Sequence, residues 1–506
     1  MGSLSRIPVY PFLIAALPVV YFHEANFRQL GSGDGIRITV LYWVITGILL
    51  FLARLIWKDV NRAAMVVAPL VVVLFLGNKV GGVLTLVFTA VAVAIGVLLI
   101  LRPADVRRGS IPLNMALLVL VGMPIVQTVI ASGAQNAPVP TTLFRDSLDL
   151  DLPRDGSRPP DIYFLLLDAL GQPDYLESNF AVPGESLSGV LERRGFTVLR
   201  RTDANYQQTS LSLSSSLNLG YVHELLDISD TENSDRRVLA ELVAKNRVVR
   251  GLRDIGYELV TYPSGYPLTR MDNPTRKHRP LVNPTFLEYY VIEDGILPLL
   301  QPLIGRGPAD FSFALRRNRL EYVFDNLDQA RAGIPDDRPV FVFAHIMAPH
   351  PPFVFSRTGE ALRSRKTFAF ADGNHWYDIH GRDGPSYQNM YVDQLTYVMK
   401  RLGEAVDAIL ASSPRPPVII VQGDHGPGSK LHLERIMYTD HEERFGIFNA
   451  WYTPPGTNGT PEQKSTAVNT FPTLFNALFN AGLPLREDRY FYARMSEPYA
   501  LQELNE

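Results

Sequence analysis

Cysteine is absent from the 506-residue sequence. This absence excludes a scaffold held together by disulfides. It fits an exported domain that avoids unwanted disulfides, although many cytosolic proteins also lack cysteine. Charge is scarce as well, because 20% of the residues are charged against about 25% in an average soluble domain. Intrinsic disorder is excluded by the apolar content, since 46% of the residues are hydrophobic.

The shortage of charge is confined to residues 1–132, which hold 14 charged side chains, 10 basic and 4 acidic. The other 374 residues hold 85, an ordinary soluble value, and can form one large α/β domain or two smaller ones. Neither part forms a large basic surface, because the first has a net charge of +6 and the second of −9. No nucleic-acid partner is therefore expected.

Five apolar runs follow one another in residues 1–132. They cover roughly residues 8–22, 38–52, 63–76, 82–101 and 111–130. A helix that spans a bilayer needs about 20 residues, within a range of roughly 17–25. A signal peptide would be a single run with a cleavage site, so it does not explain five runs. We therefore expect a transmembrane bundle of about five helices in residues 1–132; the alternative is a buried soluble helical bundle.

Basic residues predict the orientation of this bundle. With the N-terminus in the cytoplasm, the inner flanks of the runs carry seven basic residues and the outer flanks carry three. The inner residues are Arg6, Arg54, Lys58, Arg62, Arg102, Arg107 and Arg108, and the outer ones are Arg28, Arg37 and Lys79. Because basic residues accumulate on the cytoplasmic side, we expect the N-terminus inside. An odd number of spans then places the rest of the chain in the periplasm or outside the cell.

Residues 133–160 are rich in proline, serine, aspartate and glycine, which is typical of a linker. Residues 161–506 alternate strand and helix patterns, which predicts an α/β domain with a mostly parallel sheet sandwiched by helices. Strands are expected to begin at Asp161, Phe196, Tyr257, Pro339, Pro417 and Gly446, and a long helix is expected over residues 388–411. Gly195 and Gly256 precede two of these strands as helix-stop residues. Two loops, residues 272–309 and 356–385, carry no motif that indicates a role.

Side chains that can bind a metal follow the expected strands, at the edge where an open α/β sheet binds its ligands. Asp168 follows IYFLLL, where an unpaired carboxylate is costly. It therefore either binds a metal or caps the next helix. Asp424 and His425 follow VIIVQG, and Gly426 permits a sharp turn after them. Adjacent oxygen and nitrogen donors suit Zn²⁺ or Mn²⁺, and the alternative is a surface turn.

Histidines concentrate in the same part of the chain, with seven of the ten within 97 consecutive residues. Four are candidates for the site, with ordinary loop or surface positions as the alternative: His345, His350, His432 and His441. Prolines on both sides of His350 stiffen its loop, which suits a positioned binding group. Trp376 and Arg382 either line the substrate entrance or simply pack in the core or at the surface.

The stretch NYQQTSLSLSSSLN, residues 205–218, holds six threonine and serine side chains. Most of them belong to the small-residue face of a helix. Thr209 is the first of the six and lies where this helix is expected to begin. The free N–H groups and the dipole at a helix N-terminus favour an oxyanion. Thr209 is therefore a candidate nucleophile, and N-capping without catalysis is the alternative.

Five segments, taken in order, resemble the alkaline phosphatase superfamily: IYFLLLDALG, NYQQTSLSLSSSLN, AHIMAPHPPF, GDHGPGS and VNTFPTLFNALF. With the apolar runs ahead of them, the chain is similar to the sulfatase-like membrane proteins that include lipoteichoic acid synthases and lipid A phosphoethanolamine transferases. The resemblance covers nearly the whole chain. It implies an alkaline phosphatase/sulfatase-like fold. It also implies one divalent metal, zinc or manganese, bound by Asp168, Thr209, Asp424 and His425.

The resemblance also implies the remaining roles. Thr209 would be the nucleophile and His350 a contact to the substrate phosphate or to a second metal, with His345 and His432 as further substrate-binding candidates. Sulfatases carry a cysteine or serine in a C/S-x-P-x-R motif that is converted to formylglycine. This chain has no cysteine and no such motif around Thr209, so sulfate-ester hydrolysis is disfavoured.

These roles imply a membrane-anchored phosphotransferase. It would move a phospho-head-group from a phospholipid donor to an envelope glycan or glycolipid acceptor through a phospho-threonine intermediate. The alternatives are a membrane-anchored phosphodiesterase or phosphatase, a sulfatase-like hydrolase, and a non-enzymatic partner in envelope assembly. The sequence leaves the donor, the acceptor and the oligomeric state open.

The lack of cysteine makes the expected topology directly testable, because one introduced cysteine is the only thiol in the chain. We expect a membrane-impermeant maleimide to label Ser157→Cys in intact cells, and to label Ser3→Cys only after the membrane is permeabilised. Labelling of Ser3→Cys in intact cells would contradict the N-in orientation.

Overall fold

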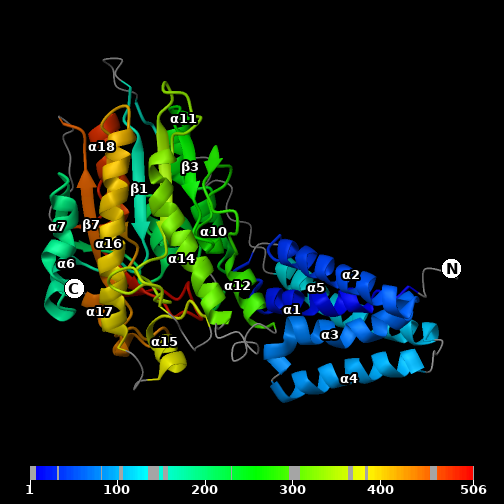
Figure 1. Cartoon of the computed structure of the whole chain (residues 1–506). Helices are drawn as coiled ribbons and strands as arrows, with labels where there is room; N and C mark the ends of the chain where they lie inside the picture. Colours follow the sequence, from blue (N-terminus) through cyan, green and yellow to red (C-terminus); the bar gives the residue numbers. More distant parts are fainter. Residues whose placement is uncertain are drawn as a thin grey trace. The chain divides into compact units, whose positions relative to one another are not determined.

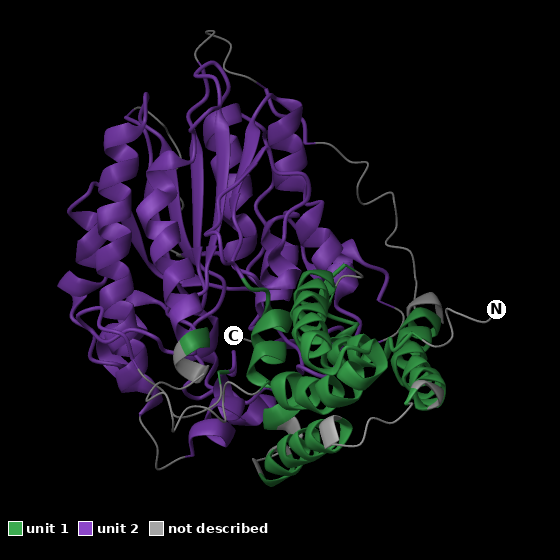
Figure 2. Cartoon of the chain, turned by 45° about the vertical axis from the view of Figure 1, so that its right-hand side comes forward, with its two compact units in different colours: residues 1–137, 284–312, 364–368 green, residues 138–283, 313–363, 369–506 purple. Residues whose placement is uncertain are grey.

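The structure is a computed structural model of the chain, and it divides into two compact units (Figure 2). The helical unit comprises residues 1–137, 284–312 and 364–368, and the α/β unit comprises residues 138–283, 313–363 and 369–506. The residues that the structure describes are 7–30, 33–80, 82–101, 106–134, 148–151, 158–228, 231–295, 308–362, 368–381, 386–455 and 464–504. The expected boundaries at residues 132 and 160 remain predictions.

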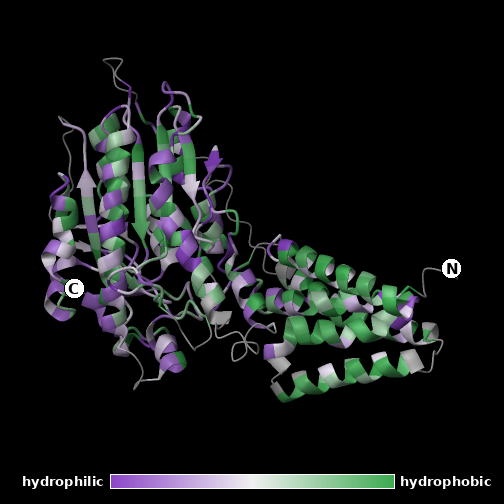
Figure 3. Ribbon diagram, in the orientation of Figure 1, coloured by the Kyte–Doolittle hydropathy of each residue, from purple (hydrophilic) through white to green (hydrophobic). Residues whose placement is uncertain are grey.

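Apolar helices occupy all five predicted runs of the helical unit (Figures 1 and 3). They are α1 (Tyr10–Asn26), α2 (Ile36–Trp57), α3 (Val60–Val80), α4 (Gly82–Leu101) and α5 (Arg107–Ala134). Within the described residues, three segments are long and apolar enough to cross a membrane: Ile36–Trp57, Val60–Asn78 and Gly109–Ala131. A shorter apolar segment covers Leu86–Leu99. The chain thus has the helices of a membrane protein, while the number of five spans remains a prediction.

A segment far along the sequence completes the helical unit. Helix α12 (Phe286–Glu293) begins with a capping box in which Thr285 accepts from the Glu288 N–H and Glu288 accepts from the Thr285 N–H. The same Glu288 carboxylate forms an ion pair with Arg37 at the start of α2, with Nε donating at 2.7 Å. Leu287 and Val291 pack into the apolar core formed by α1, α2 and α3. Part of the loop predicted over residues 272–309 is therefore a helix that packs on the apolar bundle.

The α/β unit is built on an eight-stranded sheet in the order β4-β3-β5-β1-β6-β7-β2-β8. Its strands are β1 (Ile162–Leu167), β2 (Thr197–Asp203), β3 (Glu258–Tyr262), β4 (Arg276–Lys277), β5 (Val340–Ile346), β6 (Val418–Gly423), β7 (Gly446–Tyr452) and β8 (Lys464–Thr466). Strand β7 runs antiparallel to both of its neighbours, and the other pairings are parallel. The six predicted strands and the mostly parallel sheet are confirmed. The short strands β4 and β8, and the separate pair β9 (Tyr490–Tyr492) and β10 (Gln502–Leu504), were not predicted.

Helices cover the sheet and bury its strands. The principal helices are α6 (Pro173–Asn179), α7 (Ser188–Glu192), α8 (Thr209–Ser216), α9 (Val222–Leu225), α10 (Arg237–Ala244), α11 (Arg247–Asp254), α14 (Pro308–Asn326), α15 (Gly373–His380), α16 (Tyr387–Ser412), α17 (His441–Phe445) and α18 (Thr470–Phe479). Side chains of α8, α11 and α18 share one core with β1, β5 and β6. Helices α14 and α16 lie in front of the sheet in the view of Figure 1. The long helix predicted over residues 388–411 is confirmed as α16.

The register of the three central strands sets the position of the site. Strand β1 pairs in parallel with β5 on one side and with β6 on the other. Leu166 lies opposite His345, and Leu167 lies opposite Gly423. Because all three strands run in the same direction, the residues that follow them, Asp168 and Asp424, emerge at the same edge of the sheet.

Two glycines are required for different reasons: one by its backbone conformation and the other by lack of space for a Cβ atom. Gly256 follows α11 with φ +93°, as expected for a helix stop, and a Cβ there would meet nothing within 4 Å. Gly423 ends β6, and a Cβ there would lie 2.2 Å from the backbone oxygen of Leu170.

We therefore expect Gly256→Ala to lower the free energy of unfolding by about 1–2 kcal/mol, the cost of a left-handed alanine. Gly423→Ala should cost at least about 3 kcal/mol, because backbone has to move at the turn that carries Asp424. Thermal and urea unfolding of the detergent-solubilised protein measure both. Equal losses would contradict the close approach at Gly423.

Candidate active site

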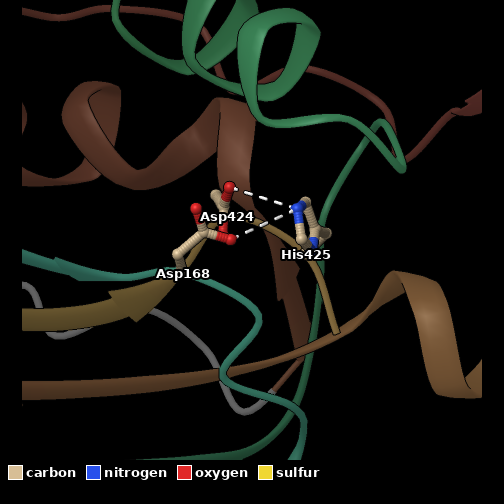
Figure 4. Close-up of side chains that lie close together, drawn as sticks. All are labelled: Asp168, Asp424 and His425. Carbon is tan, nitrogen blue, oxygen red and sulfur yellow. Dashed lines mark ion pairs between the residues drawn. The ribbon is translucent and has the colours of Figure 1, made fainter. Parts of the chain in front are cut away.

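Asp168, Asp424 and His425 form a buried group at the carboxyl ends of β1 and β6 (Figure 4). One donor atom from each lies within 4.8 Å of the other two, which is the spacing of a metal site. The His425 Nε2 atom is 3.5 Å from Asp168 Oδ1 and 3.4 Å from Asp424 Oδ2. All three side chains are buried. The two neighbouring strands thus bring the sequence-predicted metal ligands together.

Among the described residues, two carboxylate oxygens of this group have no hydrogen-bond donor, and one imidazole nitrogen faces them. His425 Nδ1 donates to the Gly426 carbonyl at 3.0 Å, so the lone pair of the neutral imidazole is on Nε2, facing the carboxylates. Within the described part of the chain, neither Asp168 Oδ1 nor Asp424 Oδ2 has a hydrogen-bond partner. Buried carboxylate oxygens without donors are costly. Two such oxygens and one imidazole nitrogen fit a divalent cation.

The turn after β1 has a strained backbone that directs an N–H group toward Asp424. Ala169 adopts a left-handed conformation with φ +63°, which costs an alanine about 1–2 kcal/mol. Its N–H donates to Asp424 Oδ1 at 3.1 Å. The hydroxyl of Tyr391 on α16 donates to the Ala169 carbonyl at 2.8 Å and holds the turn. One oxygen of Asp424 is therefore fixed by the backbone, while Oδ2 faces His425.

Thr209 adds a hydroxyl to this group. It is the first residue of α8, as predicted, and follows Gln208 in extended conformation. Its Oγ1 lies 3.2 Å from His425 Nε2. Thr209 is half-buried, whereas every later residue of α8 is buried. The hydroxyl is thus the accessible member of the group and sits at the helix end where a negative charge is favoured.

The structure places His345 behind the metal group. Its side chain is 1% exposed, and its Nε2 lies 3.3 Å from Asp168 Oδ2. Its Nδ1 lies 3.1 Å from Ser264 Oγ and 3.0 Å from Thr269 Oγ1. This geometry orients the Asp168 carboxylate from the protein interior. Ser264 and Thr269 lie in the loop after β3 and were not identified from the sequence.

His350 lies at the margin of the group, beside a carboxylate that the sequence did not indicate. Its ring centroid is 6.3 Å from that of His425, and its Nε2 is 3.8 Å from Asp372 Oδ2. Its Nδ1 donates to the Pro351 carbonyl at 2.6 Å. Asp372 belongs to the loop predicted over residues 356–385, in which neither spacing nor composition marks it.

His432, His441 and Trp376 make their described contacts with residues outside this group. The ring of His432 packs against Tyr438 at 5.9 Å, and its Nδ1 accepts from the Glu434 N–H. His441 is exposed at the start of α17. Trp376 is buried and packs edge-on against Phe353, which favours the packing interpretation for this residue. Arg382 lies outside the described residues.

Arg444 is a further residue of the site that the sequence did not indicate. It is a buried residue of α17, and its Nη1 donates to Asp372 Oδ2 at 2.8 Å. Its Nη2 lies 3.2 Å from His425 Nε2. An arginine in HEERFG, 19 residues beyond the Asp-His pair, follows no spacing rule that would have indicated its position.

The electrostatics favour the protonation states that metal binding requires. Burial opposes ionisation of Asp168, but the surrounding histidines, His350 first, hold the pKa of its carboxyl well below its usual range. Burial and the Arg444 guanidinium lower the pKa of His425 and outweigh the two carboxylates. Asp168 is therefore ionised and His425 neutral at neutral pH, as ligands must be.

We expect Asp168→Asn and His425→Gln each to lower zinc affinity at least 100-fold, because each removes a ligand. His345→Gln should lower it about 10–100-fold, the usual effect of a residue that orients a ligand. The exposed His441→Gln serves as the matched control. Competition with a chelating dye measures the affinities in the full-length protein; undiminished binding by His425→Gln would refute the assignment.

No protein-family model and no curated protein matches the chain. Several solved structures are similar. The zinc complex of the C-terminal periplasmic domain of EcEptC from Escherichia coli has 9% identity and a TM-score of 0.42, over 71% of this chain and 96% of that one. The integral membrane protein lipooligosaccharide phosphoethanolamine transferase A from Neisseria meningitidis has 11% identity and a TM-score of 0.38, over 99% of each chain.

Sulfatases are found as well. BT1596, a 2-O GAG sulfatase, has 14% identity and a TM-score of 0.39, over 68% of this chain and 74% of that one. The neighbours are thus phosphoethanolamine transferases and sulfatases, the proteins that the sequence motifs resemble. These likenesses are distant, and the function proposed below rests on the side chains of the site.

Proposed function

We propose that this chain is an enzyme, a membrane-anchored metal-dependent phosphotransferase in which Thr209 is the nucleophile. The observation that carries the proposal is the position of the half-buried Thr209 hydroxyl, 3.2 Å from His425 Nε2. That nitrogen lies within 3.5 Å of two carboxylate oxygens that lack a hydrogen-bond partner among the described residues. A reactive hydroxyl beside a metal-binding group is the arrangement that nucleophilic phosphoryl transfer requires.

Asp168, Asp424 and His425 would hold the divalent metal, together with Thr209. When bound, the ion supplies positive charge that favours the ionised hydroxyl and offsets the charge of the phosphoryl oxygens. Three oxygens and one imidazole nitrogen accommodate Zn²⁺. Nothing in the described residues specifically favours Mn²⁺.

The reaction proceeds in two displacements. Thr209 Oγ1 forms a bond to phosphorus, the bond from phosphorus to the donor's alcohol oxygen breaks, and the departing alcohol takes the proton that the threonine gives up. An acceptor alcohol then attacks the phospho-threonine and restores the hydroxyl. His350, whose Nε2 lies at the margin of the group, serves as a contact to the phosphate or to a second metal.

A lipid donor follows from the membrane helices. In the described part of the chain, three helices are long and apolar enough to cross a bilayer. They would tether the α/β unit to lipid, so a phospholipid head group is the phosphoryl donor within reach. The acceptor is a glycan or glycolipid of the envelope, on the side of the membrane away from the cytoplasm. Transfer to water instead would make the protein a phosphodiesterase or phosphatase, and the sulfatase-like hydrolase is disfavoured by the threonine nucleophile. A non-enzymatic role leaves the buried ligand set unexplained.

The test is covalent trapping at Thr209. With a phospholipid labelled in its head-group phosphate, we expect the full-length protein to acquire label at Thr209, and Thr209→Ala to acquire none and to lose at least 1,000-fold in turnover. Ser215→Ala is the matched control, because Ser215 is a buried hydroxyl on the same helix without a hydrogen-bond partner among the described residues. It should retain labelling and turnover.

Full activity of Thr209→Ala would refute the mechanism. Adding alcohol acceptors to the labelled protein separates the two enzymatic readings: a transferase passes the label to the alcohol, whereas a hydrolase releases it as a water-soluble product at the same rate with or without the acceptor.

A further inference from the structure

Arg444 joins three segments that are far apart in the sequence. Its Nε donates to the Gln207 carbonyl at 2.9 Å, two residues before the nucleophile. Its Nη1 donates to the Gly426 carbonyl at 2.9 Å, one residue after His425, and to Asp372 Oδ2 at 2.8 Å. The side chain is 4% exposed. One guanidinium thus holds the nucleophile segment and the metal-ligand turn at a defined separation.

The remaining nitrogen of Arg444 points at the reacting group. Its Nη2 lies 3.2 Å from His425 Nε2, and Thr209 Oγ1 lies 3.2 Å from the same atom. A guanidinium has five N–H donors, of which Nε uses one and Nη1 uses two. Among the described residues, His425 is the partner of Nη2, so its second hydrogen has no assigned acceptor.

The hydrogen bond from Arg444 and metal ligation by His425 Nε2 exclude each other, so the hydrogen bond is lost when a metal binds. An imidazole nitrogen has one lone pair, which either accepts from Arg444 or binds a metal. His425 Nδ1 donates to Gly426, so Nε2 is the only ring nitrogen that can ligate. When Nε2 ligates, both hydrogens of Arg444 Nη2 are available beside Thr209 Oγ1, where a phosphoryl group has to lie for attack.

We propose that Arg444 is a catalytic residue whose Nη2 donates to a non-bridging oxygen of the phosphoryl group during transfer. Its Nε and Nη1 hydrogen bonds hold the guanidinium plane for this contact. The inference rests on the proposed function, because it assumes a phosphoryl group beside Thr209. Planar, charge-assisted donation is what makes arginine suited to phosphate, and lysine does not reproduce it.

A second buried arginine provides a matched control. Arg236 is 2% exposed, and it donates from Nη1 to Ser210 Oγ at 3.1 Å and from Nη2 to the Met495 carbonyl at 2.8 Å. It therefore braces the same helix as Thr209 without contacting His425. Substitution of either arginine removes a buried guanidinium close to α8. Of these two side chains, Arg444 is the one with a nitrogen beside His425.

The experiment measures zinc affinity, the thermal midpoint and the dissociation constant for inorganic phosphate in the full-length, zinc-loaded protein. We expect Arg444→Lys to raise the phosphate dissociation constant at least 10-fold and to leave zinc affinity within threefold of the parent. Arg236→Lys should lower the thermal midpoint and leave phosphate affinity unchanged. In Arg444→Ala, added guanidinium ion should restore phosphate binding.

Three results would overturn the proposal: parental phosphate affinity in Arg444→Lys, a loss of zinc in proportion to the loss of phosphate, or an equal phosphate loss in Arg236→Lys. If Arg444→Lys fails to fold, Arg444→Gln is measured in its place, and the same results are expected for phosphate and zinc binding. If the parent protein binds zinc but no phosphate, both the proposed function and this inference are refuted. If the parent binds phosphate and the Arg444 variant binds it equally well, only this inference is refuted.

Discussion

Two buried carboxylates, those of Asp168 and Asp424, lie side by side at the ends of adjacent parallel strands. The other residues of the site have to stabilise these two negative charges. Like charges in a buried setting repel one another and resist ionisation. Here the repulsion is partly offset by His345, whose Nε2 lies 3.3 Å from Asp168 Oδ2, and by the Ala169 N–H, which donates to Asp424 Oδ1. One oxygen of each carboxylate still lacks a hydrogen-bond partner among the described residues, which is the deficit that a divalent cation removes.

The loop after β6 packs closely against the segments that carry Arg444 and Asp372. A Cβ on Gly426 would lie 1.9 Å from the Glu443 backbone oxygen, and one on Gly428 would lie 2.3 Å from an Asp372 carboxylate oxygen. These glycines let the ligand turn approach the segment that carries Arg444 and the loop that carries Asp372. Arg444 then forms an ion pair with Asp372, whose pKa stays low because this guanidinium and His350 outweigh the burial that opposes ionisation. The buried charge of Asp372 thus has a cationic partner in Arg444.

Local patterns predicted the parts of the site that lie on single elements. Asp168 and the Asp424–His425 pair end apolar strands, and Thr209 begins a helix, so periodicity and capping rules sufficed to place them. Asp372 and Arg444 come from a loop and a short helix without such a pattern, and only the folded chain brings them to His350 and His425. Helix α12 was missed for a related reason: its apolar side chains pack into the core of α1, α2 and α3, which lie far from it in the sequence.

The central claim is that Asp168, Asp424, His425 and Thr209 bind one divalent metal at which the threonine reacts. The most direct measurement is a crystal structure of the zinc-loaded protein with data collected at the zinc absorption edge. We expect an anomalous peak about 2.0–2.2 Å from Asp168 and Asp424 oxygens and from His425 Nε2, with Thr209 Oγ1 in the same shell. A fully occupied zinc elsewhere, with His425 Nε2 still accepting from Arg444, would contradict it.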